Sequence, residues 1–382
     1  MRRGLIATAI AVLAFAVAGT AALAKTSGPA APAQLAACTN VSLGVMAPLT
    51  GPAAFLGQEQ LSWTRFAVTQ YNRRSGTRFK VALGDSQLSA SLARTVGRRF
   101  VANDDVMAVI GGSTSQSVIS SAGLFERAGL ASISGSATRI DLTNGQFSTF
   151  FRVIPHDAIQ SPNIVNYVAR NLRARQVVVL DSQDDYSVPL SQAVARGLRA
   201  RNVEVDRESV AADETDFSSI VANVGDDVDV VVFATQTASA AQTLSNQLRE
   251  QGKDAVVFGT DGAYSPTQYK PRLGYVSSFA NDLRFLRSAR ATVRAYNRFS
   301  RNKAFGTFGP PSYMAAWVAM GAIQRACAND GEATRSEVTR QVRRTNTPSI
   351  LGGRVRFTRR GDVRGAKFYI FRINNGNYRL VG

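Results

Sequence analysis

The stretch from Asp105 to Asp141 reads DVMAVIGGSTSQSVISSAGLFERAGLASISGSATRID and contains two short apolar runs, each followed by a loop of small polar residues. The runs at residues 106–110 and 130–133 predict buried strands of a parallel sheet. Between them, a helix is predicted to begin near Gln116. This alternation predicts an α/β fold in which both loops leave the carboxyl ends of neighbouring strands, where such folds bind ligands.

The two loops, residues 111–115 and 134–138, contain only Gly, Ser, Thr and Ala. Glycine lets the backbone approach a ligand closely, and hydroxyl and N–H groups at a helix start favour a carboxylate or a phosphate. Neither loop holds a catalytic side chain, which indicates binding without chemistry. Loops of this composition also serve as plain connectors, so the loops alone leave both interpretations open.

The composition describes a globular protein with room for two domains in 382 residues. Its 45 Lys and Arg outnumber 27 Asp and Glu, for a formal net charge of +18. The arginines are scattered rather than clustered and no nucleic-acid-binding motif occurs, so we expect no nucleic-acid partner. An anionic cell envelope is the partner that this charge favours.

The N-terminus is typical of a cleavable secretory signal, which we assign to residues 1–24. Two arginines precede an apolar run at residues 5–17, and small residues form the cleavage box at residues 22–24. Residues 25–39 read as an Ala/Pro/Ser linker. No later apolar segment is long enough to span a membrane. We therefore expect an extracytoplasmic location, in the periplasm or at the cell surface.

Two cysteines, Cys38 and Cys327, are compatible with an oxidising compartment. Cys38 precedes the first predicted strand and Cys327 ends a predicted helix, so both would lie at the same end of one lobe and could form a disulfide. The alternative is a lipid on Cys38, because residues 35–38 look like a lipid-attachment box. The sequence leaves both possibilities open.

Catalytic constellations are missing from the sequence. Its single histidine, His156, excludes a histidine-based metal cluster and makes a catalytic triad improbable. No phosphate-binding P-loop and no GxSxG nucleophile elbow occur. We therefore expect a binding protein without cofactor or metal. An enzyme remains the rival class, and turnover of a bound amide or ester would reveal it.

Four stretches together resemble the extracytoplasmic solute-binding proteins of branched-chain amino acid ABC transporters, the Leu/Ile/Val-binding type. The stretches are VMAPLTGP at residues 45–52, the block at residues 110–138, FRVIPHD at residues 151–157 with Gln160, and FGTDG at residues 258–262. Each is weak alone, but their order and spacing are specific. The resemblance runs from Val41 to the C-terminus.

The resemblance implies a type I periplasmic binding fold, with two doubly wound parallel-sheet lobes joined by a three-strand hinge. A second series of alternating strands and helices after residue 153 agrees with this. Residues 40–153 and 285–351 would form the N-terminal lobe, and residues 154–284 and 352–382 the C-terminal lobe. Crossings are expected near residues 152–155, 277–284 and 351–354.

The resemblance also implies roles for single residues. The two small-residue loops would hold an α-carboxylate and part of an α-ammonium, and an acid of the second lobe would pair with the ammonium. The expected ligand-binding residues are Leu56, Thr114, Ser115, Ser136, Ala137, Thr138, Tyr186, Gln236 and Asp261. Asp261 could instead be a loop cap, and Tyr186 an exposed loop tyrosine.

The expected function is capture of an amino acid-like ligand, most simply a branched-chain or aliphatic one, for delivery to a membrane ABC permease by a monomer. Asp261 is shorter than the Glu of some family members, and the loop around Gln236 lacks their tyrosines. An amide, a urea-like compound or an aromatic carboxylate is therefore the alternative ligand. The same clamp could also act as the sensor of a signalling receptor.

Overall fold

The computed structural model describes residues 36–38, 41–300 and 305–382, which belong to one compact unit. A five-stranded sheet forms the centre of its first lobe. The strands lie in the order β3-β2-β4-β5-β6 and all run parallel, as the apolar runs predict. They are β2 (Ser42–Ala47), β3 (Lys80–Asp85), β4 (Val106–Ile110), β5 (Ala131–Ser134) and β6 (Phe150–Arg152).

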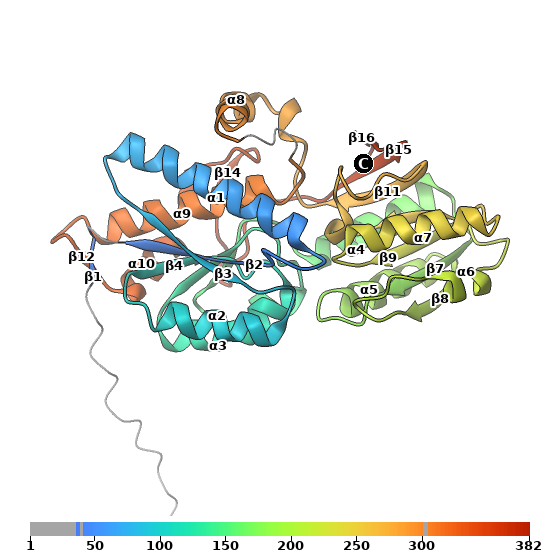
Figure 1. Cartoon of the computed structure of the whole chain (residues 1–382), viewed down its shortest axis with the longest axis horizontal. Helices are drawn as coiled ribbons and strands as arrows, with labels where there is room; N and C mark the ends of the chain where they lie inside the picture. The colour runs from blue at the N-terminus through green and yellow to red at the C-terminus, as the bar shows by residue number, and fades with distance from the viewer. Residues whose placement is uncertain (1–35, 39–40, 301–304) are drawn as a thin grey trace, which may run out of the picture. The chain divides into compact units, whose positions relative to one another are not determined.

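Helices cover both faces of this sheet (Figure 1). Successive strand residues point to opposite faces, so Val45 and Met46 of β2 belong to two different hydrophobic cores. The core around Val45 includes α1 (Ala54–Ser75), α9 (Gly309–Ala326) and α10 (Arg335–Arg343), and the core around Met46 includes α2 (Ala90–Val101) and α3 (Ser115–Arg127). This is the doubly wound arrangement that the alternation predicts.

A seven-stranded sheet forms the second lobe, in the order β16-β15-β11-β10-β9-β7-β8. The five strands from β11 to β8 are parallel, whereas β15 and β16 add antiparallel strands at one edge. The strands are β7 (Gln176–Asp181), β8 (Glu204–Ser209), β9 (Val230–Ala234), β10 (Val256–Gly259), β11 (Leu273–Ser278), β15 (Tyr369–Asn374) and β16 (Asn377–Leu380). The turn between β15 and β16 is the predicted one, with positive φ at Asn375 and Gly376.

Both faces of the second sheet are covered as well. The core on one face includes α4 (Asp157–Asn166) and α5 (Ser187–Arg199), and the core on the other includes α6 (Ser218–Asn223) and α7 (Ala238–Glu250). The remaining elements are β1 (Ala36–Ala37), η1 (Ile140–Thr143), η2 (Tyr167–Asn171), η3 (Asp261–Ala263), η4 (Leu283–Phe285), η5 (Arg287–Ala289), α8 (Arg290–Phe299), β12 (Glu332–Ala333), β13 (Asn346–Pro348) and β14 (Arg354–Arg356).

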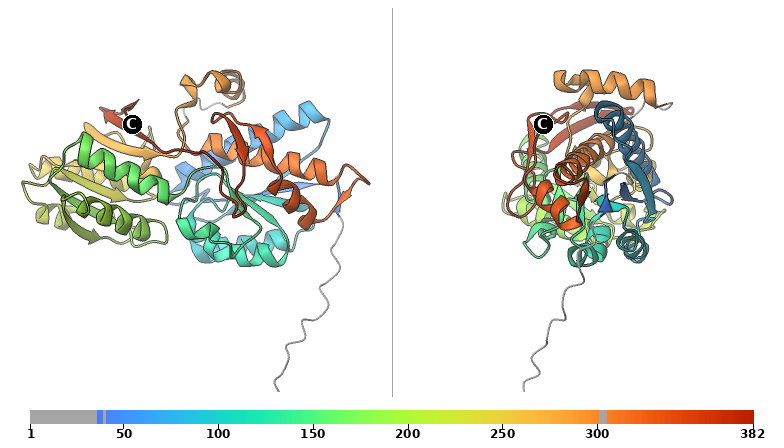
Figure 2. Two further views of the ribbon diagram at one scale, coloured as in Figure 1. Left: turned by 180° about the vertical axis from the view of Figure 1, so that it is seen from behind. Right: turned by 90° about the vertical axis from the view of Figure 1, so that its left-hand side faces the viewer.

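The chain passes between the two sheets after β6, after β11 and before β15. Figure 2 shows the last passage from behind, in dark red. Val355 and Phe357 pack in the core of the first lobe, and β14 pairs with β13. The third passage therefore follows residue 363 and lies beyond the predicted crossing near residues 351–354. The exact lobe boundaries stay a prediction, and these contacts favour a later third crossing.

Cys38 forms a disulfide with Cys327, which caps the C-terminus of α9. A cysteine in a disulfide has no thiol to which a lipid could be attached. The predicted signal peptide and most of the linker lie outside the described residues. Within the part of the chain that the structure describes, no helix is both long and apolar enough to cross a membrane.

Candidate functional site

The loop after β4 places two hydroxyl groups at the N-terminus of α3. Thr114 is the N-cap residue, and its Oγ1 accepts a hydrogen bond from the backbone N–H of Ser117 at 3.4 Å. Ser115 begins the helix, and its Oγ is buried without a hydrogen-bond partner among the described residues. A buried hydroxyl without a partner is costly, so the Ser115 hydroxyl is well placed to bind a ligand.

The loop after β5 holds three of the predicted residues. The Ser136 Oγ accepts a hydrogen bond from the Gln60 side-chain amide at 2.7 Å and donates one to the Ser113 carbonyl. The Ala137 N–H donates a hydrogen bond to the Ser134 Oγ at 2.9 Å. The Thr138 Oγ1 is buried and has no partner in the described part of the chain. Thr138 therefore offers a second buried hydroxyl, which lies near enough to Asp157 to lower the pKa of that acid.

Asp261 lies buried in the second lobe, at the start of η3. Its carboxylate accepts hydrogen bonds from the Tyr186 hydroxyl at 2.7 Å and from the Gln160 side-chain amide at 2.5 Å. Burial raises the pKa of Asp261 to about 6, and these two hydrogen bonds oppose the rise. The structure thus brings Asp261 and Tyr186 together. Tyr186 is buried rather than an exposed loop tyrosine.

A second buried acid, Asp157, lies between these two groups and was not singled out as a site residue from the sequence. It begins α4, and its backbone N–H donates to the Thr138 carbonyl at 2.9 Å. Neither side-chain oxygen has a hydrogen-bond partner among the residues described. Burial, followed by the charge of Asp261, raises the pKa of Asp157 to about 8. The sequence signal that points to Asp157 is its spacing from Gln160, because this spacing places both side chains on one face of a helix start just after Pro155.

Two cavities open between the lobes, and of the hydroxyls and acids described above Asp157 alone lines one of them. The larger, about 610 Å³, is lined by Gln116 and Arg139 of the first lobe and by Asp184 and Asp185 of the second. The smaller, about 150 Å³, is lined by Arg139 and Asp157 among others. Both include Arg139, so we treat them together as the interlobe cleft.

Polar contacts span the mouth of the interlobe cleft. The Gln236 side-chain amide donates to Gln116 Oε1 at 3.3 Å and to Asp184 Oδ2 at 3.0 Å. Arg139 forms an ion pair with Asp185 at 3.3 Å. We call these contacts the interlobe clasp. Gln236 is buried, and its hydrogen bond to Gln116 joins the two lobes.

Leu56 lies apart from the other predicted residues. It is buried in a hydrophobic cluster with Ile154, Phe279 and Phe308, beside the segments that pass between the lobes. No described contact joins it to Asp261 or Thr138. Its role in lining a ligand side-chain pocket stays a prediction.

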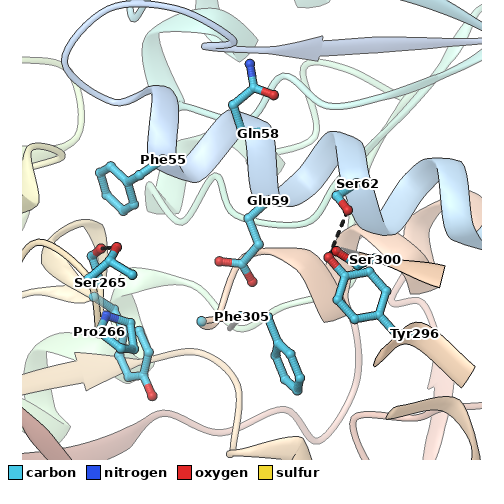
Figure 3. A pocket seen from close by; sticks show the side chains of 12 residues that line it. Phe55, Gln58, Glu59, Ser62, Ser265, Pro266, Tyr296, Ser300 and Phe305 are labelled. Atoms are coloured by element: carbon cyan, nitrogen blue, oxygen red, sulfur yellow. Dashed lines mark hydrogen bonds between the residues drawn. The ribbon is translucent and has the colours of Figure 1, made fainter. Parts of the chain in front are cut away.

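A further cavity of about 330 Å³ lies beside α1 and, like the two cavities of the interlobe cleft, is lined by none of the nine predicted residues (Figure 3). Figure 3 shows Glu59 pointing from α1 into it, with Phe55 and Phe305 nearby. Burial raises the pKa of Glu59 to about 7. The carboxylate already accepts a hydrogen bond from the Gly309 N–H at 2.8 Å, at the start of α9. Because this acid stabilises a helix N-terminus, we assign Glu59 a structural role.

The site therefore combines two kinds of polar group. The first lobe offers the neutral hydroxyl of Ser115 at the N-terminus of α3 and that of Thr138 in the loop after β5, which suit a carboxylate. At the boundary with the second lobe lie Asp157 and Asp261, which suit a cation. Within the described residues, no group of three or more His, Cys, Asp or Glu side chains could hold a metal ion.

Known proteins share both the sequence pattern and the fold. Residues 40–377 match the family described as periplasmic binding protein. The Leu/Ile/Val-binding protein homolog 3 of Brucella melitensis is 26% identical over 360 residues, which cover 91% of this chain and 94% of that protein.

Two solved structures have a similar fold. A leucine-binding protein from Thermotoga maritima superposes with a TM-score of 0.80 at 20% identity, covering 90% of this chain and 98% of that one. A solute-binding protein from R. palustris in complex with benzoate superposes with a TM-score of 0.79 at 14% identity, covering 90% and 95%. Type I periplasmic binding proteins are thus this chain's neighbours in fold.

Proposed function

The chain belongs to the periplasmic binding protein family, and on that premise we propose that it captures an amino acid between its two lobes and delivers it to a membrane ABC permease. The relatives' names point to branched-chain or aliphatic amino acids, as in the Leu/Ile/Val-binding protein homolog of Brucella melitensis. The protein would act by binding and lobe closure rather than by catalysis.

The observation that carries this proposal is the chemical difference between the two sides, or walls, of the site: the first lobe offers hydroxyl groups and the second lobe offers a carboxylate. The hydroxyls of Ser115 and Thr138 are buried and unpartnered in the described residues. The carboxylate of Asp261 is buried on the other wall. A zwitterion whose carboxylate meets the hydroxyls and whose ammonium meets Asp261 would satisfy both walls at once.

An aromatic carboxylate is the competing ligand, because a protein of the same fold from R. palustris is solved with benzoate. Such a ligand has no cationic group for the buried acids. Binding it would bury a second negative charge near the ionised Asp261 with no cation to neutralise the pair, at a cost that hydroxyl donors do not offset. The two acids therefore favour a ligand that carries an ammonium.

The setting is extracytoplasmic. Membership of the family supports it, and the disulfide between Cys38 and Cys327 belongs in an oxidising compartment. We propose that the N-terminal segment directs export and is removed, and that the protein then works as a monomer.

Asp261→Asn tests the ammonium pairing. The variant keeps the shape of the side chain and removes its charge, so leucine binding measured by calorimetry should weaken more than tenfold, about 1.4 kcal/mol or more. Asp226→Asn is the matched control, because that acid is exposed and pairs only with Lys253 in the second lobe. Equal leucine affinity of Asp261→Asn and wild type would refute the pairing.

A further inference from the structure

Asp157 is the least satisfied charged group of the interlobe cleft. Its side chain is 2% exposed, and neither carboxylate oxygen has a hydrogen-bond partner among the described residues. It also lines the smaller cavity of the cleft, which holds about 150 Å³. A buried acid is normally paired, so one that faces a cavity without a partner indicates that a ligand supplies the partner.

The backbone holds Asp157 between the two walls of the site. Its N–H donates to the carbonyl of Thr138, which belongs to the carboxylate-binding wall. One helical turn later on the same face, Gln160 donates to Asp261. The carboxylate of Asp261 is close enough for its charge to raise the pKa of Asp157.

We infer that Asp157 is a second carboxylate of the ligand site, that it holds the ligand's ammonium together with Asp261, and that it releases its proton to solvent when the ammonium binds. The inference rests on the proposed function, because it takes an ammonium to be part of the ligand. The step is an acid dissociation: the Asp157 O–H bond breaks, the proton goes to water, and the carboxylate accepts an N–H hydrogen bond from the ligand.

The charged groups around Asp157 are consistent with this step. The nearby Thr138 hydroxyl, then Arg152 of β6 and Arg139 before η1, lower the pKa of Asp157, but less than burial and the charge of Asp261 raise it. Each arginine already pairs with another acid, Arg152 with Asp362 and Arg139 with Asp141. The Tyr186 hydroxyl is neutral, since burial raises its pKa well above 10.

The neighbouring His156 also stays neutral, because burial and the charge of Arg152 lower its pKa. No cation of the described chain therefore neutralises both acids. A ligand ammonium would supply the missing positive charge.

Proton release is measured by titrating leucine calorimetrically at pH 7.5 in phosphate and in Tris, whose ionisation enthalpies differ. Asp261, with a pKa of about 6, is already ionised at that pH. We expect wild type and the control Asp226→Asn to release roughly half a proton to one proton per leucine, and their affinity to rise roughly ten- to a hundredfold between pH 6 and pH 8. Asp157→Asn should release none, lose this pH dependence and bind leucine about tenfold more weakly at pH 8.

The outcomes separate this inference from the proposed function. Leucine binding by wild type without proton release and with a flat affinity between pH 6 and pH 8 would overturn the inference and leave the amino acid receptor intact. This readout needs only wild type, so it holds even where Asp157→Asn does not fold. No binding of leucine, isoleucine, valine or alanine would overturn both proposals together.

Discussion

Two buried ionisable groups five residues apart, Arg152 and Asp157, flank the first passage between the lobes and have opposite surroundings. The Arg152 guanidinium donates to Asp362 at 2.6 Å, to the Thr143 hydroxyl at 2.6 Å and to the Arg139 carbonyl at 2.7 Å. Asp157 has no side-chain partner in the described residues. A buried charge with every hydrogen bond satisfied stabilises the fold, whereas one with none indicates a binding position.

Replacing the satisfied charge should have the largest effect. Arg152→Met leaves Asp362 without its ion-pair partner. It also removes the hydrogen bond that Arg152 donates to the Ala137 carbonyl, in the loop that carries Thr138. We expect a loss of about 3–5 kcal/mol in the free energy of unfolding, measured in urea without ligand. Arg360→Met is the control, because Arg360 is exposed. A loss below about 1 kcal/mol would show that Arg152 is not the structural charge of the pair.

Replacing Asp157, which has no side-chain hydrogen-bond partner among the described residues, should instead raise the free energy of unfolding. The folded, unliganded protein keeps the proton of Asp157 up to about pH 8, whereas an unfolded aspartate loses it near pH 4. The stability that this proton uptake contributes is therefore complete at low pH and is lost as the pH rises through about 8.

Asp157→Asn should remove that loss. We expect the variant to match wild type near pH 5 and to exceed it by roughly 4 kcal/mol near pH 9, in thermal or urea unfolding, because wild type loses about 1.4 kcal/mol per pH unit up to its folded pKa of about 8. Asp261 contributes only up to about pH 6, so the range from pH 6 to pH 9 isolates Asp157. A variant less stable than wild type at pH 9 would mean that the carboxylate is satisfied in the unliganded protein.

The interlobe clasp should give the smallest effect, because its charges are partly exposed. In the ion pair, Arg139 is 25% and Asp185 is 44% exposed, and such a pair contributes roughly 0.2–1 kcal/mol. Arg139→Ala should therefore speed leucine release about two- to fivefold in stopped-flow measurements. Lys253→Ala, which breaks an ion pair within the second lobe, should leave release unchanged. Equal rates of leucine release from both variants would show that the interlobe clasp does not slow release.

The sheets were predictable from the sequence because β4, β5, β7 and β9 are short apolar runs with clear boundaries. The partner of β14 was not predictable. Its sequence Arg-Val-Arg has one apolar residue, which does not distinguish pairing with β13 from pairing in the C-terminal hairpin. For that reason the sequence predicts a third passage earlier in the chain than the one that the contacts of β14 favour.

The site was predictable only in part. Ser115 and Thr138 follow apolar strands, and Asp261 follows β10, so strand ends and resemblance together pointed to them. Asp157 lies at a helix start, and its burial depends on how α4 packs in the core of the second lobe while its first residue contacts Thr138 of the first lobe. Such packing between distant segments has no local pattern in the sequence.

The central claim is that the interlobe cleft binds a zwitterion, and thermal unfolding at pH 7.5 with leucine, 4-methylpentanoate and 3-methylbutylamine tests it most directly. The second compound lacks the ammonium and the third lacks the carboxylate. The account predicts that leucine at a hundred times its dissociation constant adds about 2.7 kcal/mol of stability, and that each fragment adds far less at the same concentration. Stabilisation by 4-methylpentanoate equal to that by leucine would contradict it.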